Sequence, residues 1–117
     1  MKVIKSNNTT TFDIDNTLLI WPKDWKQEAQ GRVQLDYGDE KVYLVPHQMH
    51  ITFLKHCHNR GDFVILWSKN GVDHCVQVAK KLKLEKYIDV CMSKPTRHVD
   101  DATTISAIVG DRVFIEE

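Results

Sequence analysis

The feature that most restricts the fold is a run of five apolar residues, FVILW at positions 63–67, which ends at Ser68. A continuous apolar run of this length is typical of a strand buried on both faces, as in a parallel sheet. Parallel strands need crossover connections of a dozen or more residues, which are usually helical. The run therefore predicts an α/β fold in which helices flank a mainly parallel sheet.

Apolar residues recur at helical spacing on both sides of this run. The stripe before it is Met49, Phe53 and Cys57, with Leu54 beside them, and the stripe after it is Val72, Val76, Ala79 and Leu82. We expect Pro46 in the first turn of the first helix and Gly61 in a left-handed conformation after its end. Further strands are expected at residues 9–13, 87–91 and 113–115, with an edge strand at 2–5 and a short helix or turn at 105–109.

A β-hairpin is expected at residues 32–45. Val33, Leu35 and Tyr37 fall on one face of the first strand, and Gly38-Asp39 fits a two-residue turn. Residues 32–45 are too few to form a domain of their own. We therefore expect one domain over residues 1–117, with the hairpin as a flap.

Composition narrows the class of protein. The 117 residues are 42% hydrophobic and 27% charged, and 16 Lys+Arg balance 16 Asp+Glu. The zero net charge argues against a strongly electrostatic nucleic-acid binder without excluding a local basic patch. We expect no membrane span and no signal peptide, because no apolar run is long enough and the N-terminus lacks an apolar core. Three widely spaced cysteines indicate free thiols in a reducing cytosol, and hence a cytoplasmic protein.

Polar residues follow the first predicted strand in the stretch TTTFDIDNTLL, positions 9–19. Asp13 and Asp15 are separated by one residue, and Asn16 and Thr17 suit a turn because their side chains hydrogen-bond local backbone. One carboxylate can attack phosphorus while a second transfers a proton to and from the leaving oxygen. Alone, the pattern is equally that of an ordinary polar turn.

Three further polar groups follow later predicted strands. Ser68-Lys69-Asn70 ends the apolar run, Lys94-Pro95 follows the third strand, and Asp100-Asp101 comes shortly after. A hydroxyl and backbone N–H groups at a helix start can hold a phosphoryl oxygen. A lysine supplies a positive charge, and paired carboxylates suit Mg²⁺.

In this order the four groups resemble motifs I–IV of the haloacid dehalogenase (HAD) superfamily, in its small capless phosphatase type with a DxDxT motif. The resemblance implies a Rossmann-like (HAD-like) sheet and an Mg²⁺-dependent phosphatase that forms an aspartyl-phosphate. It assigns Asp13 as nucleophile, Asp15 as acid and base, and Ser68 and Lys94 as catalytic residues. Thr17, Ser68, Lys69 and Asn70 would bind substrate. Asp13, the Asp15 carbonyl, Asp100 and Asp101 would hold Mg²⁺.

One departure concerns spacing, because only five residues separate Lys94 from Asp100. A parallel crossover normally needs a dozen or more residues, so the usual helix between the last two motifs is absent or reduced to a loop. The placement of the last strand stays open.

The substrate also stays open. We expect a small phosphorylated metabolite or nucleotide; a polynucleotide end or phosphoprotein, or an inactive binding module of the same fold, are the alternatives. The hairpin at residues 32–45 or a second subunit would narrow the entrance to the active site. Trp21, Trp25 and Tyr37 either line this entrance or pack on the core. His47 and His50 lie one helical turn apart, but no zinc set is complete, and we expect solvent-facing histidines.

Overall fold

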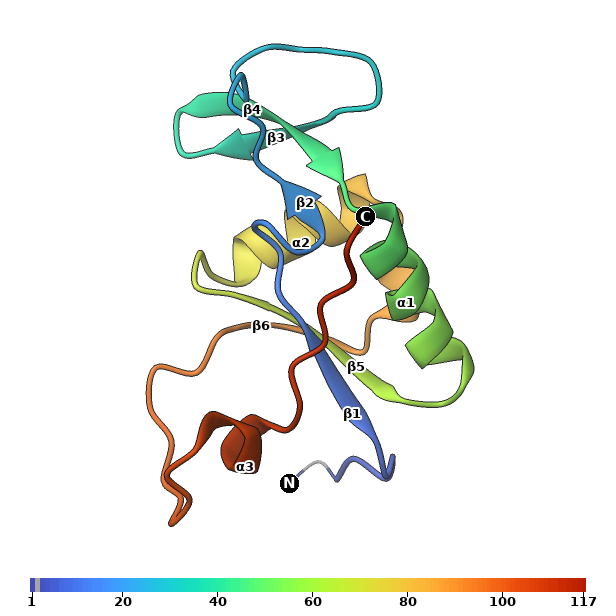
Figure 1. Cartoon of the computed structure of the whole chain (residues 1–117), viewed down its shortest axis with the longest axis vertical. Coiled ribbons are helices and arrows are strands. Elements are labelled where there is room, and N and C mark those ends of the chain that lie inside the picture. Colours follow the sequence, from blue (N-terminus) through green and yellow to red (C-terminus); the bar gives the residue numbers. More distant parts are fainter. Residues whose placement is uncertain (2) are drawn as a thin grey trace.

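A computed structural model describes residue 1 and residues 3–117, and is organised around a three-stranded parallel sheet (Figure 1). The strand order is β1-β5-β6. The strands are β1 (Thr9–Phe12), β5 (Phe63–Ser68) and β6 (Val90–Ser93), and the main crossover helices are α1 (Gln48–Asn59) and α2 (Val72–Lys81). The expectation of an α/β fold with a parallel sheet is confirmed.

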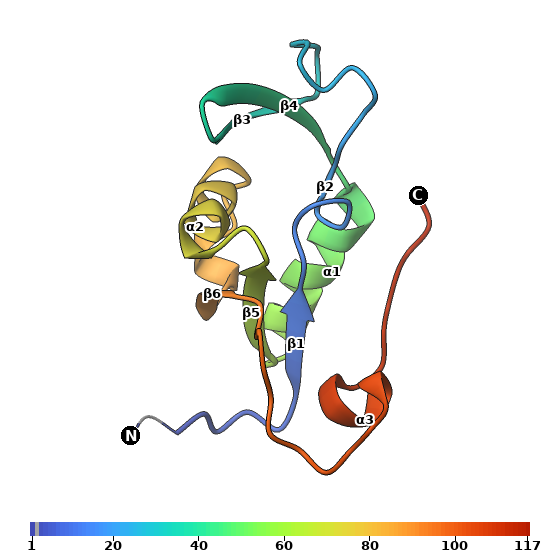
Figure 2. The ribbon, with the colours of Figure 1, turned by 90° about the vertical axis from the view of Figure 1, so that its left-hand side faces the viewer.

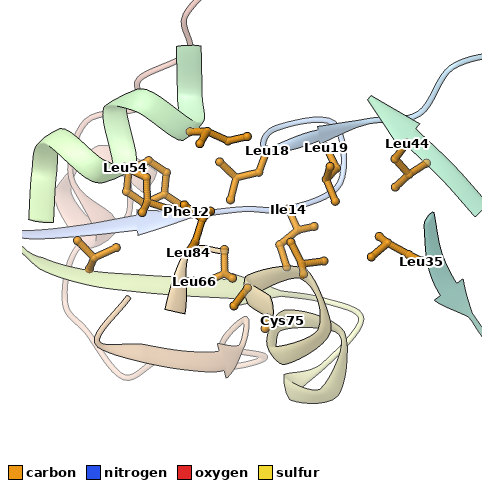
Figure 3. Close-up of a cluster of buried hydrophobic side chains, with 14 of the residues drawn as sticks. Phe12, Ile14, Leu18, Leu19, Leu35, Leu44, Leu54, Leu66, Cys75 and Leu84 are labelled. Carbon is orange, nitrogen blue, oxygen red and sulfur yellow. The ribbon is translucent and has the colours of Figure 1, made fainter. Parts of the chain in front are cut away.

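The buried core lies between this sheet and the two helices (Figure 3). Side chains alternate along β5: Val64, Leu66 and Ser68 are buried, whereas the residues between them are partly exposed. The prediction of a strand buried equally on both faces is therefore wrong. The crossover helices α1 and α2 lie on the same face of the sheet, because both crossovers run in the same direction across it. Leu54 of α1 and Cys75 of α2 are both fully buried in the same core.

A second, antiparallel sheet has the order β2-β4-β3. Its strands are β2 (Leu19–Ile20), β3 (Val33–Tyr37) and β4 (Glu40–Pro46). The predicted hairpin is confirmed, with Gly38 at φ 64° in its turn. Leu35 and Leu44 are buried, so the hairpin shares the core instead of standing free of it.

The first helix begins at a different residue from the one predicted, and the buried faces of both helices differ from the predicted apolar stripes. Pro46 is the last residue of β4, and α1 begins after His47, whose ring Nδ1 accepts a hydrogen bond from the His50 amide. Met49 is 49% exposed and Val72 is 45% exposed, so neither belongs to an inward stripe. The inward faces instead include buried histidines, which apolar spacing does not count. Gly61 takes the expected positive φ, 92°.

The remainder of the chain has little regular structure. A 3₁₀ turn, η1 (Glu85–Tyr87), precedes β6, which therefore starts later than predicted, and the short helix α3 (Ile105–Val109) lies where expected. The strand predicted at 113–115 is wrong, and residues 3–5 form no strand, while Lys2 lies outside the described residues. Cys57, Cys75 and Cys91 have free thiols, as predicted. No helix in the described part of the chain is long and apolar enough to cross a membrane.

Candidate active site

Three of the predicted site residues meet at the carboxyl end of the parallel sheet, on the side of the hairpin (Figure 2). Asp13 follows β1, Ser68 ends β5 and Lys94 follows β6. The Lys94 Nζ lies 3.2 Å from the Asp13 Oδ1, and the Lys94 amide donates to the Ser68 carbonyl at 3.0 Å. The carboxyl ends of parallel strands lie at one sheet edge, which explains why residues far apart in sequence meet here.

A tight turn places the two carboxylates on either side of fully buried Ile14. The amides of Thr17, Leu18 and Leu19 all donate to the Ile14 carbonyl, at 3.0, 2.9 and 3.1 Å. Asn16 has φ 61°, a left-handed conformation that Asn tolerates better than most residues. The Thr17 hydroxyl donates to the Asp13 Oδ2 at 3.2 Å, so Thr17 orients the first carboxylate.

The Asp15 carboxylate is surrounded by nitrogen donors. The Trp21 Nε1 donates to Oδ1 at 2.9 Å, and the Asn70 Nδ2 donates to Oδ2 at 2.8 Å. The His74 Nε2 lies 3.4 Å from the same Oδ2. Partial burial raises the pKa of Asp15, but the approach of His74 and the bonds from Trp21 and Asn70 outweigh it, and the pKa lies below its ordinary value. Asp15 is therefore ionised at neutral pH.

The turn between β5 and α2 carries Ser68, Lys69 and Asn70. Ser68 is buried, and its Oγ accepts a hydrogen bond from the Asn70 amide at 3.0 Å. This bond closes the turn before α2, and Ser68 does not cap the helix itself. Lys69, the next residue, is exposed. Gly71 follows with φ 94° and is the N-cap of α2.

The aromatic residues pack together as a wall beside Asp15. The Trp21 ring lies edge-on to Trp25 at 5.5 Å and to Tyr37 at 5.1 Å between centroids. All three are partly buried against the core, as the packing role requires, and Tyr37 also lines a cavity of about 370 Å³ between the hairpin and the start of α2. It is lined by Asp36, Tyr37, Gly38, Asn70, Asp73, His74 and Gln77.

Asp100 and Asp101 are not brought to Asp13. Both are exposed, and the Asp100 Oδ1 accepts a hydrogen bond from the nearby Ala102 amide at 2.8 Å. Within the described residues no three His, Cys, Asp or Glu side chains lie close enough together to hold a metal ion. The chain leaves β6 at the sheet edge opposite β1, and residues 94–104 form no helix or strand.

The expectation of solvent-facing histidines on α1 is wrong for two of them. His47 and His50 are 4% and 3% exposed, and their rings stack at 3.8 Å between centroids. The His50 Nδ1 lies 2.8 Å from the Thr17 carbonyl, and its Nε2 accepts a hydrogen bond from the Ile115 amide at 2.9 Å. This pair is a structural link between α1, the turn after Asp15 and the end of the chain.

Two residues were not predicted as neighbours of Asp15. Trp21 was expected to line the entrance or to pack on the core, and His74 was not considered at all. The sequence carries no local signal for His74, because Asn70 lies before the N-cap of α2 and the helical i, i+4 rule does not relate the two residues. Comparison of the chain with protein-family models, with curated proteins and with solved structures finds no match.

Proposed function

We propose that this chain is a HAD-type phosphatase that hydrolyses phosphate monoesters through an aspartyl-phosphate. The observation that carries the proposal is the Asp13–Lys94 pair, 3.2 Å apart, with Asp15 two residues further on. A carboxylate nucleophile next to a fixed cation and a second carboxylate is the minimum set for this chemistry. The resemblance of the sequence motifs to the HAD superfamily supports the same assignment.

In the proposed reaction an Asp13 oxygen attacks phosphorus and the alcohol oxygen leaves with a proton from Asp15. Water then attacks the aspartyl-phosphate, and Asp15 takes the proton from that water, which releases phosphate and restores Asp13. Because its pKa lies below the ordinary value, Asp15 is ionised and can accept a proton in the second step. The negative charge of a bound phosphoryl group raises the pKa of a neighbouring carboxyl, which favours the proton that the first step needs. Lys94 and backbone N–H groups after Ser68 offset charge on the phosphoryl oxygens.

Mg²⁺ is part of the proposal through the motif resemblance alone. Of the four expected ligand residues, only Asp13 and Asp15 lie at the site, while Asp100 and Asp101 are exposed elsewhere. This arrangement does not fit a complete metal site, and we assign no step to the ion.

The substrate is proposed to be a small phosphorylated metabolite or nucleotide. The cavity of about 370 Å³ beside Asn70 and His74, the two residues at the Asp15 Oδ2, is of the size that takes a small molecule. Asp36 and Asp73 in its lining disfavour an alcohol that carries further negative charge.

The test replaces the nucleophile. Asp13→Asn keeps the size of the side chain but removes the attacking oxygen, so turnover of an aryl phosphate should fall by a factor on the order of 10³ or more. Asp111→Asn, at an exposed position, is the matched control and should leave turnover unchanged. Mass spectrometry of the acid-quenched wild type should find a phosphoryl adduct on Asp13. An Asp13→Asn protein with near-normal activity contradicts the proposed nucleophile.

A further inference from the structure

His74 is a buried polar side chain that the proposed reaction does not use. It is 7% exposed, and its Nε2 makes no hydrogen bond of good geometry to any described residue. Buried polar atoms are nearly always paired, so an exception needs an explanation. The nearest acceptor is the Asp15 Oδ2 at 3.4 Å.

Both oxygens of Asp15 are approached by nitrogen donors from three separate segments. Trp21, which follows β2, bonds Oδ1, and Asn70, in the turn after β5, bonds Oδ2. His74, on the first turn of α2, lies against Oδ2 as well. One donor on each oxygen limits rotation of the carboxylate about its χ2 angle. The third donor lies slightly beyond bonding distance, where a small shift of the carboxyl toward it would complete a hydrogen bond.

The hairpin holds the His74 ring in place. Tyr37 at the end of β3 packs edge-on against His74 at 5.7 Å and against Trp21 at 5.1 Å between centroids. Gln77, one helical turn after His74, bonds the hairpin twice: its Nε2 donates to the Asp36 carbonyl at 2.9 Å, and its Oε1 accepts from the Asp36 amide at 2.7 Å. The hairpin is thus fixed to α2 and supports the two rings that contact Asp15.

We propose that His74 is a positioning residue that aims the Asp15 carboxyl at the leaving oxygen, and that Tyr37 of the hairpin supports it. This inference rests on the proposed function. His74 lies against Asp15 in the lining of the cavity, and its proposed effect passes through Asp15 as the acid and base. The competing explanation is that His74 only fills space between Tyr37 and the core.

The test compares two variants on two substrates. His74→Phe keeps a ring for packing against Tyr37 and removes the N–H group, whereas His74→Gln keeps an N–H donor of similar reach. An alkyl phosphate needs its leaving oxygen protonated, whereas 4-nitrophenyl phosphate hardly does. The parameter is kcat/KM, because it reports the steps up to departure of the alcohol.

We expect His74→Phe to lower kcat/KM on the alkyl phosphate by a factor on the order of 10², the low end of what acid catalysis contributes. On 4-nitrophenyl phosphate the loss should be only a few-fold, and His74→Gln should recover most of the loss on the alkyl substrate. Tyr37→Leu, which does not touch Asp15, should give a smaller loss with the same substrate dependence.

Several outcomes would overturn the inference. Equal losses on both substrates, no loss on either, or no recovery by His74→Gln would each show that His74 only packs. If His74→Phe does not fold, the substrate dependence of Tyr37→Leu decides in the same way. A wild-type protein inactive on both substrates would overturn the proposed function, and this inference with it. A different pair of results would overturn this inference alone. In that case Asp13→Asn is inactive, as the proposed function requires, but the His74 variants lose the same factor in kcat/KM on both substrates.

Discussion

At the scale of single residues, the Asp13–Lys94 ion pair contributes to the charge of the site more than to the stability of the fold. The two side chains are 33% and 29% exposed. Ion pairs of this kind contribute about 0–1 kcal/mol to stability in double-mutant measurements. The value of Lys94 therefore lies in the positive charge that it holds beside a nucleophile and an incoming phosphoryl group.

The variant Lys94→Met should therefore lose activity without a matching loss of stability. We expect kcat/KM on an aryl phosphate to fall by a factor on the order of 10², as for the removal of one charge-stabilising group. The free energy of unfolding, measured with urea, should change by no more than about 1 kcal/mol. Lys80→Met, at an exposed position on α2, is the control. A large loss of stability with little loss of activity would assign Lys94 to the fold.

Residues that follow a buried strand directly could be predicted, because their position depends only on where the strand ends. Asp13, Ser68 and Lys94 meet at one sheet edge for this reason. His74 and Trp21 could not be predicted as neighbours of Asp15, since their positions depend on how α2 and the loop after β2 pack. Asp100 and Asp101 were expected at Asp13 from motif order, but no strand carries them there.

At the scale of elements, Gly71 connects the site to α2. It has φ 94° and ψ 176°, a region of backbone conformation that is essentially restricted to glycine. An added Cβ at Gly71 meets no atom within 4 Å, so a substitution there strains the backbone without a clash. Asn70 and His74 lie on either side of this position, and a shift of the backbone would move both away from Asp15.

Gly71→Ala should therefore reduce both stability and activity. We expect a loss of about 1–3 kcal/mol in the free energy of unfolding, the usual cost of such a backbone conformation. Gly61→Ala is the matched control, because Gly61 has a similar φ of 92° and equally open surroundings but lies at the opposite end of the sheet. Both variants should lose stability, and only Gly71→Ala should lose kcat/KM on an aryl phosphate beyond the fraction that unfolds. Equal kcat/KM in the two variants would show that the backbone conformation of Gly71 does not affect the reaction.

The hairpin, the parallel strands and α3 could be read from the sequence because alternation, apolar runs and turn residues are local signals. The inward faces of α1 and α2 could not. Buried His47, His50 and His74 occupy positions that an apolar stripe treats as solvent-facing. Each has a polar atom within 4 Å of another polar group, and such polar contacts depend on tertiary structure.

At the scale of the whole molecule, the segment after β6 decides whether the proposed metal site forms. Residues 94–104 contain no helix or strand, and the only described hydrogen bond of Asp100 is to its neighbour Ala102. Moving Asp100 or Asp101 toward Asp13 would therefore break little packing. Mg²⁺ commonly uses one or two carboxylates together with substrate phosphate oxygens, so either acidic residue would complete such a set.

We expect a chelator to abolish turnover and Mg²⁺ to restore it, with Ca²⁺ a poor substitute because of its looser geometry and higher ligand number. Asp100→Ala should raise the Mg²⁺ concentration needed for half-maximal activity, and Asp111→Ala should not. An unchanged Mg²⁺ requirement in both Asp100→Ala and Asp101→Ala would leave Asp13 as the only carboxylate ligand. Full activity in the presence of chelator would remove the metal from the proposal.

The last residues of the chain lie along α1 and reach the site through the histidine pair. The Ile115 amide donates to the His50 Nε2 at 2.9 Å, and the opposite nitrogen of that ring lies 2.8 Å from the Thr17 carbonyl. Phe114 packs edge-on against His50 at 4.8 Å between centroids. A chain that ends at Asp111 would leave a buried ring nitrogen without its partner, at a cost of about 1–3 kcal/mol.

We therefore expect this truncation to lower the free energy of unfolding by that amount and to loosen the turn that presents Thr17 to Asp13. Hydrogen exchange of the Thr17, Leu18 and Leu19 amides, which all bond the Ile14 carbonyl, should become faster. Phe114→Ala should give a smaller effect of the same kind, and Glu116→Ala, at an exposed position, should give none. Exchange at these amides that does not respond to the truncation would show that the histidine pair holds the turn without help from the end of the chain.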